Sequence, residues 1–399
     1  MPATMKRDAP ALEATLVELD RALLKRRRAT LTTLSGAGEW PAVIVDGRRA
    51  LDFSSNDYLA LGRHPEIASA MAAAAVRHGA GSGASHLVAG HGVEHARLEE
   101  ELALFTGRTR ALLFSTGYMA NLAVLGALAG RGELTLLDRL CHASLIDAAL
   151  LCRARLKRFA HADADAAECA LAASAGSACL VATDGVFSMD GDMAPLAKLA
   201  RASRAHNCWL VVDDAHGLGV LGPSGGGSLE ECGLDEEAVP VLVGTLGKAF
   251  GTFGAFVAGS ADVIELLVQK ARPYAYTTAL PQPVAAATRE ALRIAAREPW
   301  RRERVLHLAR RFSRAAKQLD IPVMASATPI QPVLLGSTAR VLRAQEELLT
   351  AGFWVVAIRP PTVASGSSRL RVTLSAGHTE EQVDALVEVL GKIMARLPP

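Results

Sequence analysis

Five short apolar runs, separated by stretches of helical periodicity, constrain the fold of this chain more than any other feature. They lie at residues 111–115, 134–138, 179–183, 209–213 and 241–244. Runs that are apolar on both faces and alternate with helices are typical of a parallel-rich sheet covered on both sides. Chemistry in such sheets gathers at the carboxyl ends of the strands. The residues at or just after these ends that can carry chemistry are Asp138, Asp184, Asp213 and Lys248.

The residues around Lys248 indicate what such a site would hold. Lys248 stands among glycines just after the last run, and Asp213 and His216 end the run before it. A lysine amine can hold an aldehyde cofactor as a Schiff base, and a buried carboxylate can keep a pyridine nitrogen protonated so that the ring acts as an electron sink. Thr245 can offer a phosphate group a hydroxyl donor. This pattern predicts an enzyme that uses pyridoxal 5'-phosphate (PLP).

Two other phosphate-binding patterns fit less well. A Walker-type loop ending at Lys248 would need glycine at position 242 and serine or threonine at 249, where the chain has Leu242 and Ala249. Residues 217–222 do spell G-x-G-x-x-G after a strand, but the proline and glycines of 223–227 oppose the helix that a dinucleotide fingerprint must open. A purely structural lysine would be the default for Lys248 alone, and the neighbouring Asp213 and His216 argue against it.

Composition narrows the class of protein further. Half of the 399 residues are hydrophobic and 21% are charged, which favours a large domain accompanied by a smaller one. The net charge of +2 gives no sign of nucleic-acid binding. The six cysteines form no C-x-x-C pair and have no ligand-like spacing with histidine, so neither a metal site nor a disulfide framework is expected. The N-terminus lacks the apolar segment of a secretion signal, and we expect a cytoplasmic protein without a membrane span.

The order of the patterns suggests three parts. We expect an N-terminal helix at 11–28 and short strands near Val43 and Leu51 within residues 1–50, then a large cofactor-binding domain over 51–280. After the prolines at 281–283 come helical stretches, apolar runs at 331–335, 354–358 and 370–374, and a last helix from Thr379. This mixture predicts a small C-terminal α+β domain over 281–399.

Four further residues could carry chemistry. Gly117 and Tyr118 lie where a strand enters a helix, and a helix N-terminus of this kind can bind a phosphate. His142 follows the run at 134–138; alone it would be an ordinary histidine, but beside a Lys248 cofactor it is suited to stack on a pyridinium ring. Arg359, stiffened by two following prolines, suits a bidentate carboxylate clamp, although a structural ion pair is the alternative.

Taken together, these motifs resemble the α-oxoamine synthase family of fold-type I PLP enzymes. The resemblance runs from residues 53–59 to 369–375, which is nearly the whole chain. It implies an α/β fold in which a large domain with a mostly parallel seven-stranded sheet precedes a smaller C-terminal α+β domain. It also implies a homodimer whose active sites lie between the two subunits.

The resemblance assigns roles to individual residues. Lys248 would bind the cofactor covalently, Asp213 would pair with the pyridinium nitrogen and His142 would stack on the ring. The other implied cofactor residues are Gly117, Tyr118, Ser188, His216 and Thr245, with Thr277 and Thr278 reaching the neighbouring subunit's phosphate. The implied substrate residues are Arg26, in an arginine cluster at 26–28, and Asn56, Arg359 and Thr362.

The reaction that the resemblance implies is a decarboxylative condensation of an amino acid with an acyl thioester. The sequence Ile-Arg-Pro-Pro-Thr-Val at 358–363 looks like the members that join L-alanine to a pimeloyl thioester in biotin biosynthesis. The acyl group would be carried either by CoA or by a carrier protein. Glycine C-acetyltransferase, 5-aminolevulinate synthase and a non-catalytic homologue remain alternatives.

Replacing the lysine tests this interpretation directly. In Lys248→Ala, both the covalent attachment of PLP and turnover should be lost, because the variant has no amine to hold the aldehyde or to move a proton. The visible absorption of the purified protein after PLP addition measures the first effect, and product formation measures the second. A fully active variant would refute the assignment of Lys248.

Overall fold

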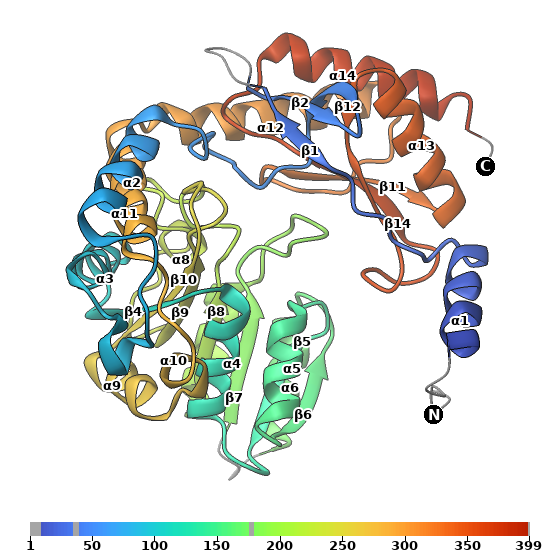
Figure 1. Cartoon of the computed structure of the whole chain (residues 1–399). Coiled ribbons are helices and arrows are strands. Elements are labelled where there is room, and N and C mark those ends of the chain that lie inside the picture. Colours follow the sequence, from blue (N-terminus) through green and yellow to red (C-terminus); the bar gives the residue numbers. More distant parts are fainter. Residues whose placement is uncertain (1–8, 35–39, 175–178, 398–399) are drawn as a thin grey trace. The chain divides into compact units, whose positions relative to one another are not determined.

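The computed structural model describes residues 9–34, 40–174 and 179–397, which form two compact units (Figure 1). The first unit comprises Met1–Ser55, Leu308–Ser326 and Ile330–Pro399, and the second comprises Asn56–His307 and Ala327–Pro329. The N-terminal residues thus belong to the same unit as the C-terminal ones. The sequence suggested three domains, with boundaries at residues 50 and 280. That division stays a prediction.

The second unit contains a seven-stranded sheet that is parallel except for one strand. Its order is β4 (Arg110–Phe114), β10 (Ala255–Gly259), β9 (Val241–Thr245), β8 (Trp209–Asp213), β7 (Cys179–Asp184), β5 (Leu134–Asp138) and β6 (Arg155–Phe159). β10 pairs antiparallel with both of its neighbours, β4 and β9, and the pairs from β9 to β6 are parallel. The mostly parallel seven-stranded sheet predicted from the sequence is confirmed.

Two strands of this sheet escaped the sequence patterns. β6 is an edge strand whose residues Arg155, Lys157 and Arg158 are exposed, so it has no continuous apolar run. Charged side chains are usual on an edge strand because they discourage pairing with other chains. β10 is fully buried, but it is short and comes directly after the glycine-rich segment around Lys248. That segment has the sequence pattern of a loop, so the strand that follows it was not predicted.

Helices cover both faces of this sheet. Four of them share one hydrophobic core with Leu137, Val211 and Val243 of the strands: α4 (Gly117–Leu128), α5 (Ala143–Leu151), α9 (Ala261–Lys270) and α10 (Arg272–Ala275). Outside that core, α3 (Val93–Thr106) packs on β4 and α7 (Leu196–Ala205) packs on β8. The remaining helices of this unit are α2 (Pro65–His78), the π-helix η1 (His86–Gly90), α6 (Ala164–Ala172), α8 (Ser228–Glu231) and α11 (Gln282–Arg297).

The first unit has two small sheets. One has the order β1 (Leu31–Thr33), β2 (Ala42–Val45), β3 (Arg48–Asp52) and β12 (Phe353–Trp354), and the other has β11 (Ile330–Gly336), β14 (Ser368–Thr373) and β13 (Val356–Ile358). The apolar run at 354–358 therefore divides between two sheets. Helices α13 (Thr338–Thr350) and α14 (Glu380–Met394) belong to this unit, and α12 (Trp300–Gln318) continues into it from the other. Thr379 caps the last helix as expected, with its hydroxyl accepting from the Gln382 N–H.

The N-terminal helix is shorter than its pattern indicated. α1 spans Ala9–Arg21, whereas the apolar spacing predicted a helix to residue 28. Leu23 has a φ of 57°, which lies in the left-handed region and cannot continue a right-handed helix. No helix within 9–34, 40–174 or 179–397 is both long and apolar enough to pass through a membrane.

Gly251 tests how tightly the turn after Lys248 is packed. Its φ is 65°, and a Cβ there would overlap the backbone nitrogen of Gly62. Gly107 has a similar φ of 64°, but in the described part of the chain a Cβ there would meet no heavy atom within 4 Å. Gly107→Ala should cost about 1–2 kcal/mol of unfolding free energy for the left-handed backbone alone. Gly251→Ala should cost about 1–3 kcal/mol more because of the overlap.

Urea unfolding of the two variants measures this difference. Equal losses for Gly251→Ala and Gly107→Ala would contradict the close approach of the two backbones.

Candidate active site

The carboxyl ends of the parallel strands and the start of α4 surround a cavity of about 200 Å³ in the second unit. Its lining residues are Gly117, Tyr118, His142, Asp184, Val186, Ser188, Asp213, Ala215, His216, Thr245 and Lys248. All cofactor residues expected from the sequence are therefore brought together here, except Thr277 and Thr278. Asp184, Val186 and Ala215 are additional; only Asp184 gave a signal in the sequence, as a carboxylate at a strand end.

Lys248 begins a chain of polar contacts. Its Nζ lies 2.9 Å from Nε2 of His216, and Nδ1 of the same ring lies 2.6 Å from the Tyr58 hydroxyl. That hydroxyl donates to Oδ1 of Asn56 at 3.3 Å. An ammonium that donates to Nε2 requires the Nδ1–H form of the imidazole, which then donates to Tyr58. The tyrosine, which the sequence gave no reason to select, thus links Asn56 to the lysine.

Asp213 is held by two donors at the end of β8. Its Oδ2 accepts from the Asn121 side chain at 2.6 Å, and its Oδ1 accepts from the Ala215 N–H at 3.1 Å. The Asn121 amide also donates to the Ser144 hydroxyl at 2.8 Å. Asn121 is completely buried in α4, and the carboxylate is only 7% exposed. The orientation of Asp213 is therefore set by a side chain that lies outside the cavity lining.

His142 lies at the start of α5 and caps that helix. Its Nδ1 accepts from the Ser144 N–H at 3.3 Å and lies 2.7 Å from the Ser144 hydroxyl. Burial lowers the pKa of His142; the charge of Asp213 opposes this effect and that of Lys248 reinforces it. The imidazole is thus neutral at physiological pH, and a neutral ring can lie against a cationic ring without charge repulsion.

Asp184 is a second buried carboxyl group in the lining of the cavity. It is opposite Asp213 in the pairing of β7 with β8, and its Oδ1 accepts from the His142 N–H at 3.1 Å. Burial, together with the charge of Asp213, raises the pKa of Asp184 well above its usual range. The ionised form of Asp184 is therefore disfavoured, and its hydrogen bond fixes the main chain beside His142.

The start of α4 offers donors for an anion. Thr116 caps the helix, with its hydroxyl accepting from the Met119 N–H at 3.2 Å. The first N–H groups of a helix have no partner within it, and the helix dipole favours a negative charge there. A Cβ at Gly117 would meet no heavy atom of the described residues within 4 Å, so the backbone is open to a ligand. The Tyr118 hydroxyl donates to Asp147.

Thr245 and Thr278, both expected near a phosphate, make contacts within their own chain. Thr245 donates to the Gly254 carbonyl at 3.2 Å, so it would have to rotate to donate to a ligand. Thr278 forms an isolated bridge with Ser85, and its carbonyl accepts from the Ser115 hydroxyl at 3.4 Å. Neither Thr277 nor Thr278 lines the cavity of its own chain. Their contribution to a neighbouring subunit stays a prediction.

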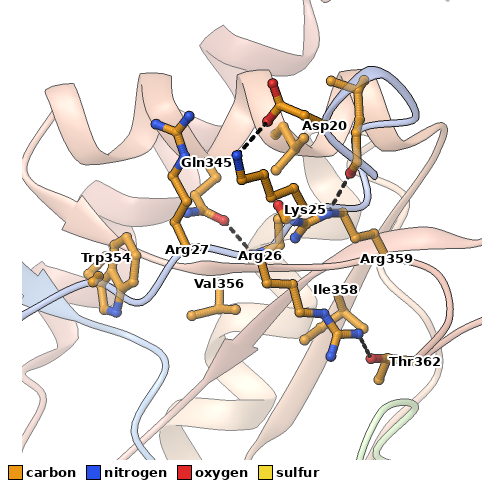
Figure 2. A pocket seen from close by; sticks show the side chains of 14 residues that line it. Asp20, Lys25, Arg26, Arg27, Gln345, Trp354, Val356, Ile358, Arg359 and Thr362 are labelled. Atoms are coloured by element: carbon orange, nitrogen blue, oxygen red, sulfur yellow. Dashed lines mark hydrogen bonds and ion pairs between the residues drawn. The ribbon is translucent and has the colours of Figure 1, made fainter. Parts of the chain in front are cut away.

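Three of the expected substrate residues meet in a basic pocket of about 590 Å³ in the first unit (Figure 2). Arg26 donates to the Thr362 hydroxyl at 2.7 Å. Arg359 donates through Nε to the Leu23 carbonyl at 2.9 Å and through Nη2 to the Lys25 carbonyl at 2.7 Å. Burial and the charge of Arg26 lower the pKa of Arg359. The fourth expected residue, Asn56, belongs to the second unit.

The contacts of Arg359 differ from both alternatives considered for it. No carboxylate within residues 9–34, 40–174 and 179–397 pairs with its guanidinium, which donates to backbone carbonyls of the segment that follows α1. These are neutral acceptors, and a carboxylate would be the stronger partner for a guanidinium. A substrate carboxylate could therefore displace the segment from Arg359.

The groups around the Lys248 cavity fit PLP by their chemistry. An amine, a buried carboxylate with fixed orientation, a neutral imidazole and a helix N-terminus correspond to the aldehyde, the pyridine nitrogen, the ring face and the phosphate. All of them lie in one unit and around one cavity. These residues would hold the cofactor without a change in the fold of that unit.

Comparison with known proteins gives consistent results. The family model described as aminotransferase class I and II matches residues 48–390. An 8-amino-7-oxononanoate synthase of Cellvibrio japonicus is 57% identical over 354 residues, covering 89% of both chains.

Solved structures are also similar. The serine palmitoyltransferase of S. paucimobilis with a bound PLP–myriocin aldimine has a TM-score of 0.91 and 28% identity, covering 98% of this chain and 99% of that one. The 8-amino-7-oxononanoate synthase of Francisella tularensis has a TM-score of 0.76 and 30% identity, covering 87% and 98%.

Asn121 provides a test of the site away from the reacting groups. Asn121→Ala should weaken PLP binding about tenfold, because Asp213 loses a charge-assisted hydrogen bond and its fixed orientation. Titration of the cofactor-free protein with PLP, followed by visible absorbance, measures the change. Gln269→Ala, an exposed position on α9, is the control and should leave the affinity unaltered. An unchanged affinity in Asn121→Ala would show that this amide does not support the cofactor site.

Proposed function

Because the chain belongs to the class I and II aminotransferase family and, within it, to the 8-amino-7-oxononanoate synthases, we propose that the Lys248 cavity is where it joins L-alanine to a pimeloyl thioester. The chain is a PLP-dependent acyltransferase of biotin biosynthesis. The observation that carries the placement of the reaction is the convergence of Lys248, Asp213 and His142 on one cavity. The relatives' names support the choice of reaction.

The residues of the cavity divide the chemistry among them. Bound PLP supplies an electron sink for the negative charge that forms at the α carbon of the amino acid. Asp213 holds the proton on the pyridine nitrogen, which is what makes the ring a sink. Lys248 would hold the cofactor, and its amine would serve as the base that removes the α proton of alanine. His142 covers the ring face, where its neutral form adds no positive charge.

His216 adjusts the proton on Lys248. Its Nε2 lies 2.9 Å from Nζ and can accept a hydrogen bond from the ammonium, while Tyr58 receives the hydrogen bond from Nδ1. A base works only when its amine is deprotonated, and the neutral imidazole can take the proton from the ammonium onto Nε2, which leaves the amine free to act as a base. His216 is therefore proposed to serve both the cofactor and the base.

Substrate carboxylates are proposed to bind through the arginines of the first unit. Arg359 is assigned to the carboxylate of alanine and Arg26 to the distal carboxylate of the pimeloyl group, and Thr362 and Asn56 are further proposed substrate residues. Support comes from the basic pocket in which Arg26, Arg359 and Thr362 meet. For alanine to bind, its carboxylate must replace the carbonyls of Leu23 and Lys25 on Arg359.

A homodimer is proposed as the working form. Tyr276, next to Thr277, is 76% exposed, and Val88 on η1 is 79% exposed. η1 and α10 pack together, so these apolar groups lie on neighbouring elements. Large apolar side chains exposed on neighbouring elements are typical of an interface. Thr277 and Thr278 would then complete the partner's phosphate site, and the cytoplasmic location stays a prediction from the sequence.

The substrate assignment is tested by direct assay. PLP-loaded protein mixed with L-alanine and pimeloyl-CoA should release free thiol and form a product with the mass of 8-amino-7-oxononanoate. Glycine and L-serine in place of alanine, and acetyl-CoA and palmitoyl-CoA in place of pimeloyl-CoA, are the matched alternatives. Faster thiol release with one of these pairs, with the corresponding product mass, would reject the proposed substrates but not the PLP chemistry.

A further inference from the structure

His161, just after β6, lies between two carboxylates outside the cavity. Its Nδ1 is 3.0 Å from Oδ1 of Asp138, and its Nε2 is 2.8 Å from Oδ2 of Asp192. A neutral imidazole has one N–H and can donate to only one carboxylate. Two ionised acceptors at these distances therefore require the doubly protonated cation. The ring edge also packs on Phe187, with centroids 4.3 Å apart and planes at 83°.

One end of this bridge belongs to the turn that leads to His142. Asp138 ends β5, and its Oδ1 also accepts from the Leu140 N–H at 2.8 Å, while its carbonyl accepts from the Cys141 N–H at 3.3 Å. Its Oδ2 accepts from the Ala162 N–H at 2.8 Å. Asp138 thus shapes the turn that delivers His142 to the cavity.

The other end belongs to a small hairpin at 186–193. Val186 pairs with Met193 in an isolated bridge, and the Phe187 N–H donates to the Asp192 carbonyl at 2.9 Å. The Gly191 N–H closes the hairpin by donating to the Phe187 carbonyl at 2.8 Å. The lining residues Val186 and Ser188 lie on this hairpin.

We propose that His161 is a positioning residue: as an imidazolium it ties the turn carrying His142 to the hairpin carrying Ser188, and so holds two sides of the cofactor cavity at a fixed separation. This inference rests on the proposed function, in which His142 covers the PLP ring, and on the expectation from the sequence that Ser188 also contacts the cofactor. His161 itself does not line the cavity and takes no part in the chemistry. Its loss should therefore act through the mobility of the hairpin.

The charges around His161 give the bridge a pH dependence. The groups that face the ring are Asp138, Asp192 and Asp190, whose carboxylate lies in the same cluster. Burial lowers the pKa of His161, but the hydrogen bonds to Asp138 and Asp192 outweigh it and raise the pKa from 6.5 to about 9. Because the pKa is raised, the bridge is fully present below the ordinary value and is lost as the pH rises through about 9.

A metal ion is the competing occupant for the same side chains. His161, Asp190 and Asp192 have ligand atoms close enough together to hold one. A metal-bound histidine must offer a ring lone pair, whereas both ring nitrogens here lie at hydrogen-bond distance from carboxylates. The distances therefore favour the cationic bridge.

The test compares His161→Gln and His161→Arg with the wild type. Glutamine removes the charge, whereas arginine keeps a cation that can donate to two carboxylates and does not titrate near pH 9. Two quantities are measured: the PLP affinity of the cofactor-free protein as a function of pH, and the amide hydrogen exchange of residues 186–193 in the same protein without PLP. His206→Gln, a half-buried histidine at the end of α7, is the control.

In His161→Gln we expect PLP affinity to fall about tenfold at neutral pH, and amides 186–193 to exchange faster. The wild-type affinity should decline as the pH rises through about 9. That decline should be absent in His161→Gln, and His161→Arg should keep the neutral-pH affinity without the decline. The proposal would be overturned if His161→Gln bound PLP as tightly as the wild type and its amides 186–193 exchanged at the wild-type rate. It would also be overturned if the PLP affinity of His161→Gln declined with pH as that of the wild type does. Loss of exchange protection in the wild type on treatment with EDTA would overturn it as well, because that loss would indicate a bound metal.

A second variant decides the matter if arginine does not fit. Asp192→Asn should weaken PLP binding like His161→Gln, and the double variant should lose little more than either single one, because both break the same contact. Fully additive losses would overturn the bridge. Urea unfolding of each variant separates a local effect from global destabilisation. PLP affinity and amide hydrogen exchange are both measured without the substrates. A wild type that binds PLP but does not use alanine and pimeloyl-CoA would therefore refute the proposed reaction and leave the role of His161 standing.

Discussion

The site depends on the in-register parallel pairing of β5, β7, β8 and β9. In that pairing Asp184 lies opposite Asp213, and Asp213 lies opposite Val243, just before Thr245 and the Lys248 turn. Parallel strands place their carboxyl ends at one edge, so residues more than a hundred positions apart in the sequence reach a single cavity. A slip of one residue in either pairing would turn these side chains to the other face of the sheet.

Burial at that edge shifts the pKa values of His142 and Asp184. Asp184 lies opposite Asp213, and burial together with the charge of Asp213 raises the pKa of Asp184, which accepts a hydrogen bond from the His142 N–H. Asp213 has the Asn121 amide and the Ala215 N–H. His142 stays neutral because burial opposes its charge. Asp213 is therefore the carboxyl group whose orientation the fold fixes with two donors.

Much of this arrangement could be read from the sequence, because it follows from local patterns. The apolar runs predicted the central strands. The positions at or just beyond their ends pointed to Lys248, Asp213, His142 and His216 as site residues. What the patterns missed are residues that act through long-range contacts. Asn121 and Tyr58 meet the site residues only after folding, and each looks like an ordinary core side chain of its own segment. β6 was missed because an edge strand is charged rather than apolar.

The sequence by itself determined the fold class, the family and which residues gather around one cavity, since these depend on residue types at fixed spacings. Only the tertiary structure decided which partner each group has. It placed carbonyls of Leu23 and Lys25 on Arg359, where the sequence suggested a carboxylate, and it placed His161 between Asp138 and Asp192. Hydrogen bonds and pKa values depend on distances between segments that are remote in the chain, and those distances exist only once the sheet and its loops have packed.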